Sequence, residues 1–490
     1  MRKRKQNAPR IRSVKYNVVM NMILSSSTLI FPLVTVPYVS RVLQPYGTGA
    51  VAFAQSAMTY FSLVALLGIS SYGVRACAEI REDKVLLSQT VKELLVILVC
   101  STSAVTLIYI GCIFLVPQFR AQKTLFLIFG VGLWLSAFGV EWLYQALEQY
   151  GYITIRNIII KIICLVAMFI FVRSRSDYII YGAIVVVAGY GANICNILRL
   201  RKLVDFSIKT KLNITRHFKP MSLFFVASVS SGMYVQADTF ILGLMGTTSM
   251  VGLYQLVVKI KGTLITVVNS VGNVMLPRLS YYNTHKKSDQ AGVLVAKTLN
   301  FAYLLSLVLV CWCMLEQKGI ILILGGPEYA KAGVALMLIS PSIALSSLNS
   351  TLGYYMASVK KEKTWAIINL VGLGSAIISN VCLIHFFGIA GAAMSAVLCE
   401  LIVFVIRLYN NKKFIRTIVK YLEIIKTTLC VAVAAIVTFI ISSYIEIDDI
   451  LLNFLNDSVI YFCVILLALI VSKEYFVCQI INKYLKRSTK

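Results

Sequence analysis

Residues 220–245 read PMSLFFVASVSSGMYVQADTFILGLM, and this stretch decides how the chain folds. At 1.5 Å of rise per residue, a helix of this length crosses a hydrocarbon core of roughly 30 Å. Its one charged residue is Asp238. Whether that carboxylate lies within a membrane depends on the rest of the chain.

The composition of the whole chain is that of a membrane protein. Hydrophobic residues make up 59% and charged residues 14%, against about 25% charged residues in soluble domains. Mean hydropathy is +0.82. Apolar runs predict an all-α polytopic fold of about fourteen spans, at residues 17–39, 48–72, 94–116, 124–147, 152–172, 178–198, 220–245, 251–276, 298–324, 333–357, 364–386, 388–408, 421–444 and 458–480.

The positive charges predict the orientation of these spans. Lys and Arg total 47, and they gather in alternate loops, which the positive-inside rule assigns to the cytoplasm. Both termini are then cytoplasmic, and the first span is a retained helix instead of a cleaved signal peptide. The net charge of +27 follows from these loops. It does not indicate a nucleic-acid partner, because no soluble face collects the basic residues.

Several classes of chemistry lack their sequence signature. The 12 cysteines and 3 histidines show no metal-ligand spacing, so we expect no metal and no cofactor. No phosphate-binding GxxxxGK[ST] motif occurs, and the loops are too short for a nucleotide-binding domain. Active transport would then use an ion gradient or the gradient of the substrate.

A weak internal repeat organises the chain. One offset places Gly49 on Gly252 and Arg75 on Arg278, at corresponding ends of corresponding spans. The repeat is parallel and predicts two six-helix bundles with a substrate cleft between them. The expected parts are a basic N-terminus, the first bundle, a basic linker, the second bundle, and two extra helices with a basic tail, at residues 1–16, 17–200, 201–219, 220–409 and 410–490.

Six stretches carry a resemblance to a known family: VPYVSRVLQPYGTGAVAFAQS, YGVRACAEIRED, VEWLYQALEQYGYITIRN, QADTFILGLMGTTSMVGLYQ, GGPEYAKA and FGIAGAAMSAVLCE. In order and spacing the chain resembles the polysaccharide transporter family, within the multidrug/oligosaccharidyl-lipid/polysaccharide exporter superfamily. Members flip undecaprenyl-pyrophosphate-linked repeat units of O-antigen, capsule or exopolysaccharide. The resemblance implies two lobes, a central cationic cavity and alternating access. It also implies a bacterial cytoplasmic membrane location, membrane lipid contacts, and a polysaccharide polymerase and chain-length machinery as partners.

Charged residues within spans are the first candidate functional residues. Asp238 and Lys259 lie roughly 15 Å along two successive helices from their shared loop, and Lys261 is close by. A charge at this depth normally faces the protein interior and has a partner. Two interpretations stay open: a structural ion pair, or cavity groups that bind an anion or carry a coupling proton or sodium ion.

Two further sites follow the same reasoning. Glu141 and Lys161 lie about ten residues on either side of Gly151, and their matching depth favours a structural pair. Glu400 stands alone near the middle of its span, with Arg407 two turns away.

Arginines at span ends are the other candidates. Arg75, Arg278 and Arg41 are each typical of interface anchors. The repeat places Arg75 and Arg278 at the cytoplasmic ends of equivalent spans, where guanidinium groups would bind a pyrophosphate bidentately. Together with Lys259 and Lys261 they form the predicted cationic cleft.

Three functional classes compete. The leading hypothesis is a flippase that moves a lipid-linked oligosaccharide to the outer leaflet. The alternative is an ion-coupled multidrug or metabolite antiporter of the multidrug and toxin extrusion type, which the acids within the spans would suit. An enzyme is disfavoured, because the one acidic outer segment, residues 446–457, offers no catalytic cluster.

Overall fold

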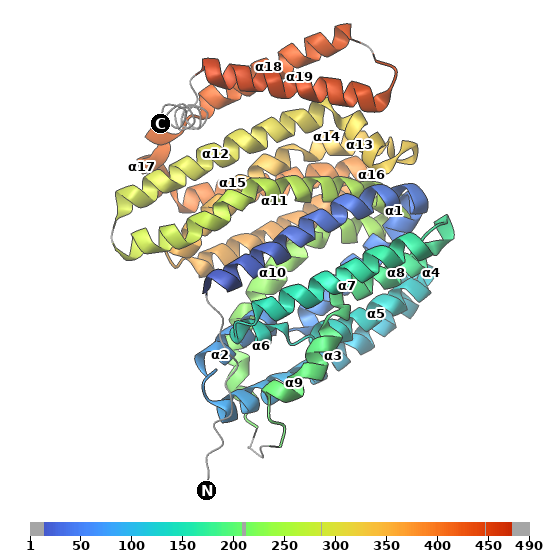
Figure 1. The fold of residues 1–490 in the computed structure, drawn as a ribbon, viewed down its shortest axis with the longest axis vertical. Coiled ribbons are helices and arrows are strands. Elements are labelled where there is room, and N and C mark those ends of the chain that lie inside the picture. The colour runs from blue at the N-terminus through green and yellow to red at the C-terminus, as the bar shows by residue number, and fades with distance from the viewer. Residues whose placement is uncertain (1–13, 208–211, 286, 446, 473–490) are drawn as a thin grey trace. The chain divides into compact units, whose positions relative to one another are not determined.

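The computed structural model describes residues 14–207, 212–285, 287–445 and 447–472 (Figure 1). Every regular element in these ranges is a helix. Helices satisfy all backbone hydrogen bonds within one segment, which a chain in lipid requires. The predicted all-α polytopic fold is confirmed.

The chain divides into two compact units, Met1–Gly252 and Leu253–Lys490. This division falls after the predicted linker at 201–219, because α10 (Thr215–Met245) packs on α1 (Val14–Ala65) of the first unit. The predicted bundle boundaries themselves stay a prediction.

In the first unit, α1 is the central element and contacts α3, α5, α7, α8 and α10. The helices besides α1 and α10 are α2 (Ile69–Glu79), α3 (Lys84–Leu115), α4 (Pro117–Ala121), α5 (Lys123–Ala137), α6 (Glu141–Ala146), α7 (Tyr150–Phe171), α8 (Tyr178–Val186) and α9 (Asn193–Leu203). A 3-10 helix, η1 (Arg175–Asp177), and a π-helical segment, η2 (Val187–Gly191), flank α8. The helix α11 (Thr248–Thr284) begins in this unit and continues into the second.

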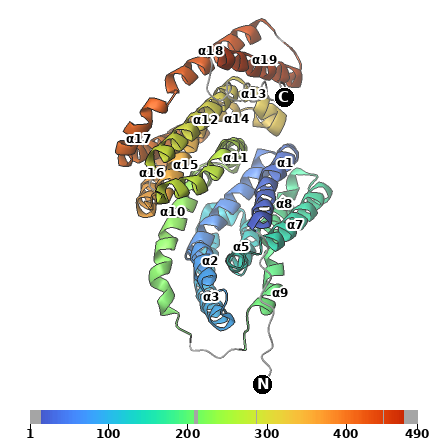
Figure 2. The same ribbon diagram turned by 60° about the vertical axis from the view of Figure 1, so that its left-hand side comes forward.

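In the second unit, α12 packs on α15 and α18, α15 packs on α16, and α18 lies beside α19 (Figures 1 and 2). The bounds are α12 (Ser288–Leu315), α13 (Gln317–Gly325), α14 (Ala332–Ile339), α15 (Pro341–Ser358), α16 (Glu362–Asn410), α17 (Lys412–Ile418), α18 (Ile424–Tyr444) and α19 (Ile450–Val471). The turns η3 (Pro327–Tyr329) and η4 (Val419–Tyr421) complete it.

Eleven segments of the described residues are long and apolar enough to cross a membrane. Two of them, α1 and α16, each join two helices across a kink, at Gln44 and Gly388. Each of these covers two predicted spans. The helix α10 covers the predicted span 220–245 without being one of the eleven. The total of fourteen stays a prediction.

The kink in α16 has a local cause. Gly388 has φ 55° and ψ −123°, a conformation that side-chain-bearing residues rarely adopt. A glycine at this position lets the chain change direction between the predicted spans 364–386 and 388–408.

Some predicted spans differ in their bounds from the helices of the structure. The span 48–72 ends at Ala65, where Leu67 and Gly68 have positive φ before α2 begins. The span 124–147 agrees with a single candidate span, Lys123–Ala146, although the helix is interrupted at Val140, which has φ 38°. The last span begins at Ile450 instead of 458, because Asp449 caps α19 by accepting from the Leu452 amide at 2.8 Å. Much of the predicted outer segment 446–457 is therefore helical.

The two glycines matched by the repeat lie where two helices touch. A Cβ on Gly49 would lie 1.9 Å from the Thr248 carbonyl oxygen, and one on Gly252 would lie 1.8 Å from that of Pro45. Only glycine permits backbones to approach this closely, as at small-residue interfaces of membrane helices.

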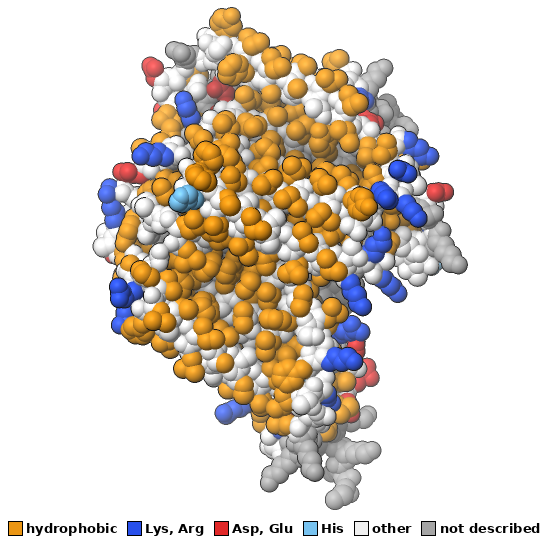
Figure 3. Space-filling view, turned by 180° about the vertical axis from the view of Figure 1, so that it is seen from behind, with side chains coloured by type: hydrophobic (Ala, Val, Ile, Leu, Met, Phe, Trp, Pro, Cys, Tyr) orange, Lys and Arg blue, Asp and Glu red, His pale blue; other side chains and the backbone are white. Residues whose placement is uncertain are grey.

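The surface also suits lipid. Many large hydrophobic side chains are exposed along the spans, and Figure 3 shows them covering most of one face while Lys and Arg lie largely toward its edges. Such a distribution is typical of a protein surrounded by hydrocarbon with polar margins.

Candidate functional site

A cavity of about 610 Å³ lies between α2 and α10 of the first unit. The break after Ala65 turns α2 so that it lines the cavity, and the predicted topology places this end at the cytoplasmic side. Its principal lining residues are Tyr72, Arg75 and Glu79 from α2 and Lys219, Leu223 and Phe224 from α10. Cations beside aromatic and apolar faces suit an anionic group attached to a sugar.

Arg75 is available at this cavity. Its Nε donates to Glu79 Oε1 at 3.1 Å, and the two side chains are 71% and 65% exposed. Ion pairs this exposed contribute little to stability. An incoming anion can therefore replace Glu79 as the partner of the guanidinium at small cost.

A buried polar network lies beside the cavity. Glu93 of α3 is fully buried and accepts from Arg216 Nη2 at 2.6 Å and from His217 Nε2 at 2.7 Å. The other ring nitrogen of His217, Nδ1, lies 2.7 Å from the Tyr72 hydroxyl. The network thus connects a cavity residue to α3 and to the start of α10.

Sequence reasoning missed this network. The signal was present, since Glu93 is an isolated acid within an apolar helix and the basic segment TRHFKP begins another one. Nothing in the sequence showed that the two segments, more than a hundred residues apart, are neighbours. The fold brings them together by packing α10 on α2.

The predicted Glu141–Lys161 pair is wrong. Glu141 Oε2 accepts from Arg156 Nη2 at 2.8 Å, and Arg156 also donates to the Ala192 carbonyl at 2.8 Å. Glu141 is the first residue of α6, after the break at Val140, so its depth does not follow from a continuous span. It keeps a structural role with a different partner.

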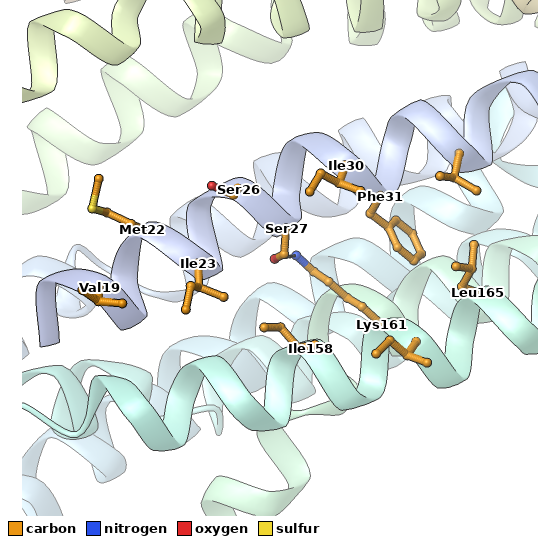
Figure 4. Close-up of a pocket in the computed structure, with 12 residues that line it drawn as sticks. Val19, Met22, Ile23, Ser26, Ser27, Ile30, Phe31, Ile158, Lys161 and Leu165 are labelled. Carbon is orange, nitrogen blue, oxygen red and sulfur yellow. Dashed lines mark hydrogen bonds between the residues drawn. The ribbon is translucent and has the colours of Figure 1, made fainter. Parts of the chain in front are cut away.

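Lys161 lies in a groove between α1 and α7. Its Nζ donates to Ser27 Oγ of α1 at 3.1 Å, and Figure 4 shows the side chain reaching from α7 toward that hydroxyl. Within the described residues it has no acidic partner.

Asp238 and Lys259 belong to different units, Asp238 to the first and Lys259 to the second. Asp238 is half-buried on α10 and lies near Tyr60 of α1. Lys259 and Lys261 are half-buried on α11. The proposed pairing of Asp238 with Lys259 stays a prediction.

Glu400 has an identifiable contact in the second unit. Asn349 of α15 donates from Nδ2 to Glu400 Oε2 at 2.7 Å. The buried Arg407 donates to the backbone carbonyl of the same Asn349, and to Asn369 Oδ1 at 3.0 Å. Asn349 therefore links the acid to the arginine that the sequence placed two turns away.

The remaining predicted arginines, Arg278 on α11 and Arg41 on α1, are both exposed. Arg278 has no ion pair within the described ranges. Its role as the repeat counterpart of Arg75 stays a prediction.

Glu316 is an acid that sequence reasoning did not single out. The predicted span 298–324 includes it, but the candidate span in the structure ends at Leu315, so the buried Glu316 lies just outside. Burial, and then the nearby charge of Asp457, raises the pKa of Glu316 to about 7.

No group of three or more potential metal ligands occurs within the part of the chain that the structure describes.

The chain is similar to known proteins. The chain is 26% identical over 356 residues to a protein of Escherichia coli K12 named "Putative O-antigen transporter", covering 70% of this chain and 82% of that protein. A protein of the same name from Shigella dysenteriae is 22% identical, covering 80% of this chain and 98% of its own. Both names describe transporters, as the sequence predicted, and not enzymes.

The fold matches a solved structure described as lipid II flippase MurJ in an inward closed conformation. The TM-score is 0.72 at 15% identity, covering 95% of this chain and 100% of that one. A family model described as MatE matches residues 224–382. A model described as polysaccharide biosynthesis protein matches residues 14–283, more than half of the chain. The chain belongs to the polysaccharide biosynthesis protein family.

Proposed function

We propose that this protein is a flippase that moves an undecaprenyl-pyrophosphate-linked oligosaccharide repeat unit from the cytoplasmic to the outer leaflet. Transport proceeds by alternating access through a cationic cleft, and the product serves surface polysaccharide synthesis. The relatives named as O-antigen transporters support the class of substrate. The flippase with the same fold supports the mode of transport.

The observation that carries the proposal is the cavity between α2 and α10. Arg75 and Lys219 supply donors for a pyrophosphate, and Tyr72 and Phe224 supply faces for a sugar. A cation-binding pocket would need acids in their place. The one acid of the principal lining, Glu79, already faces Arg75.

The other predicted residues keep the roles that the sequence suggests for them. Arg278, Lys259, Lys261 and Arg41 contact the anionic substrate along its path. Asp238 carries the coupling proton or sodium ion. Glu141 is left out of that role, since it pairs with Arg156.

A second candidate function is an ion-coupled antiporter for drugs or metabolites. The MatE match to residues 224–382 favours it. It predicts that cells expressing the protein resist cationic drugs, whereas the flippase proposal predicts unchanged resistance.

The experiment is to deplete the protein in its own cells and measure the lipid-linked glycan that accumulates unexported. Arg75→Lys and Arg278→Lys should reduce export, because lysine cannot reproduce the bidentate fork of arginine. Arg75→Ala should reduce it further at normal protein abundance. Arg120→Lys, at an exposed arginine of α4, is the matched control and should export normally. Full export by both Lys variants would refute bidentate binding of the pyrophosphate by these arginines.

We further propose that the protein resides in the bacterial cytoplasmic membrane with both termini inside. It delivers its product there to a polysaccharide polymerase and chain-length machinery. Cysteine labelling of intact cells checks the orientation. A cysteine at Thr247, between α10 and α11, should react, whereas one at Ser488, outside the described residues, should not.

A further inference from the structure

A groove of about 490 Å³ runs between α1 and α7 of the first unit (Figure 4). It is almost wholly apolar, and its lining includes Val19, Met22 and Ile30 of α1 and Ile158, Ile162 and Leu165 of α7. The lining residues of α1 run from Val19 to Val34, so the groove follows this helix for roughly 22 Å. A surface of this kind fits a long hydrocarbon chain.

One cation interrupts this apolar lining. Lys161 projects into the groove, and its polar contact is the Ser27 hydroxyl at 3.1 Å. An ammonium group in hydrocarbon is costly and normally marks a functional site. An ammonium has three donors, and the serine occupies one of them. The groove therefore suits a ligand that joins an anionic group to an apolar chain. The ammonium of Lys161 would bind the anionic group, and the apolar lining would contact the chain.

The depth of Lys161 identifies the occupant. In α7, Lys161 lies 11 residues after Tyr150 and 10 before Phe171, or roughly 15 Å from each end. It therefore lies near the middle of a core about 30 Å thick. The phosphate of a resident phospholipid stays at the membrane surface. A phosphate at mid-membrane is expected only for a lipid that is crossing.

We propose that the α1–α7 groove holds the polyprenyl chain of the transported lipid while Lys161 and Ser27 bind its phosphate halfway across the membrane. The inference rests on the proposed flippase function and adds a second anion site to it. The cavity at α2 and α10 receives the head group from the cytoplasm, and Lys161 supports the phosphate during the crossing.

Binding to the purified protein tests the site without transport. The probes are undecaprenyl phosphate, the uncharged undecaprenol and phosphatidylglycerol, titrated in detergent and read by native mass spectrometry. Lys161→Met should weaken undecaprenyl phosphate roughly tenfold or more, since it removes a charge-assisted hydrogen bond. Lys161→Arg should restore most of the affinity. Undecaprenol affinity should not change in either variant.

Neighbouring isoleucines give a matched pair of controls for the groove. Ile162 lines it and Ile163 does not, yet they are 55% and 56% exposed. Ile162→Trp should weaken both prenyl probes, whereas Ile163→Trp should weaken neither. Thermal melting of each variant establishes that it is folded.

Two results would overturn the site. Unchanged undecaprenyl phosphate binding by Lys161→Met would make the lysine purely structural. Equal competition by phosphatidylglycerol would make the groove a site for bulk lipid. Export of polysaccharide by the wild-type protein in depleted cells is measured separately. Failure of export would refute the flippase function, whereas failure of these binding experiments would refute only the site in the groove.

Discussion

The connection between the start of α10 and α3 depends on one buried carboxylate. Glu93 accepts from Gln89 Nε2 at 3.0 Å and from the backbone N–H of Asn213 at 2.8 Å, in addition to Arg216 and His217. Asn213 belongs to the segment that precedes α10. Glu93→Gln keeps the size of the side chain but removes its charge. The side-chain amide of the glutamine also brings an N–H donor next to groups that themselves donate hydrogen bonds to this position.

The cost can be worked from these contacts. Breaking a buried ion pair costs about 3–5 kcal/mol. Arg216 is 40% exposed and can be rehydrated once the pair is broken. The loss in free energy of unfolding should therefore lie at the lower end of this range, about 3 kcal/mol. For a unit of about 250 residues, each kcal/mol shifts the melting temperature by about 2–4 °C. Glu93→Gln should therefore melt roughly 6–12 °C below the wild type.

The assay is thermal unfolding of the purified protein, together with limited trypsin digestion of the segment before α10. Cleavage there should accelerate in Glu93→Gln. The control is Glu79→Gln, which removes an exposed ion pair and should shift melting by less than about 3 °C. If Glu93→Gln melts within that same small range and is cut at the wild-type rate, the carboxylate does not hold the segment.

Three further predictions concern other parts of the fold. Gly252→Ala should destabilise the protein strongly in thermal unfolding, because its Cβ would meet a backbone oxygen at 1.8 Å, whereas Gly262→Ala, with open space around it, should not. Burial raises the pKa of Glu316 to about 7 from an ordinary 4.5, so ionising this carboxyl costs more free energy in the folded protein than in the unfolded one. The stability of the protein should therefore fall as pH rises from about 4.5 through about 7. Glu316→Gln should remove that fall in melting temperature between pH 5 and pH 8. Asp238→Asn and Lys259→Met should each impair export, with partial recovery in the double variant, and strictly additive losses would reject their pairing.

Much of the fold could be predicted from apolar run lengths, because lipid forces each run into a helix. The limits lay where one or two residues redirect the chain. Val140 adopts a left-handed conformation that its β-branched side chain disfavours, so no propensity argument would end a helix there. Asp449 starts α19 earlier than hydropathy suggests, because a cap acts through one hydrogen bond and adds nothing to an apolar average.

The candidate site shows why charges are harder to predict than spans. A hairpin relates the depths of two residues, but packing sets which way each one points around its helix. Arg156 and Lys161 are five residues apart on α7, or about 140° around the helix. Arg156 accordingly faces Glu141 and the Ala192 carbonyl, while Lys161 faces α1 and Ser27. Matching depth alone assigned Glu141 to the wrong cation. The correct pairing leaves a lysine, instead of an ion pair, in the apolar groove between α1 and α7, and our proposal of a phosphate site there rests on this lysine.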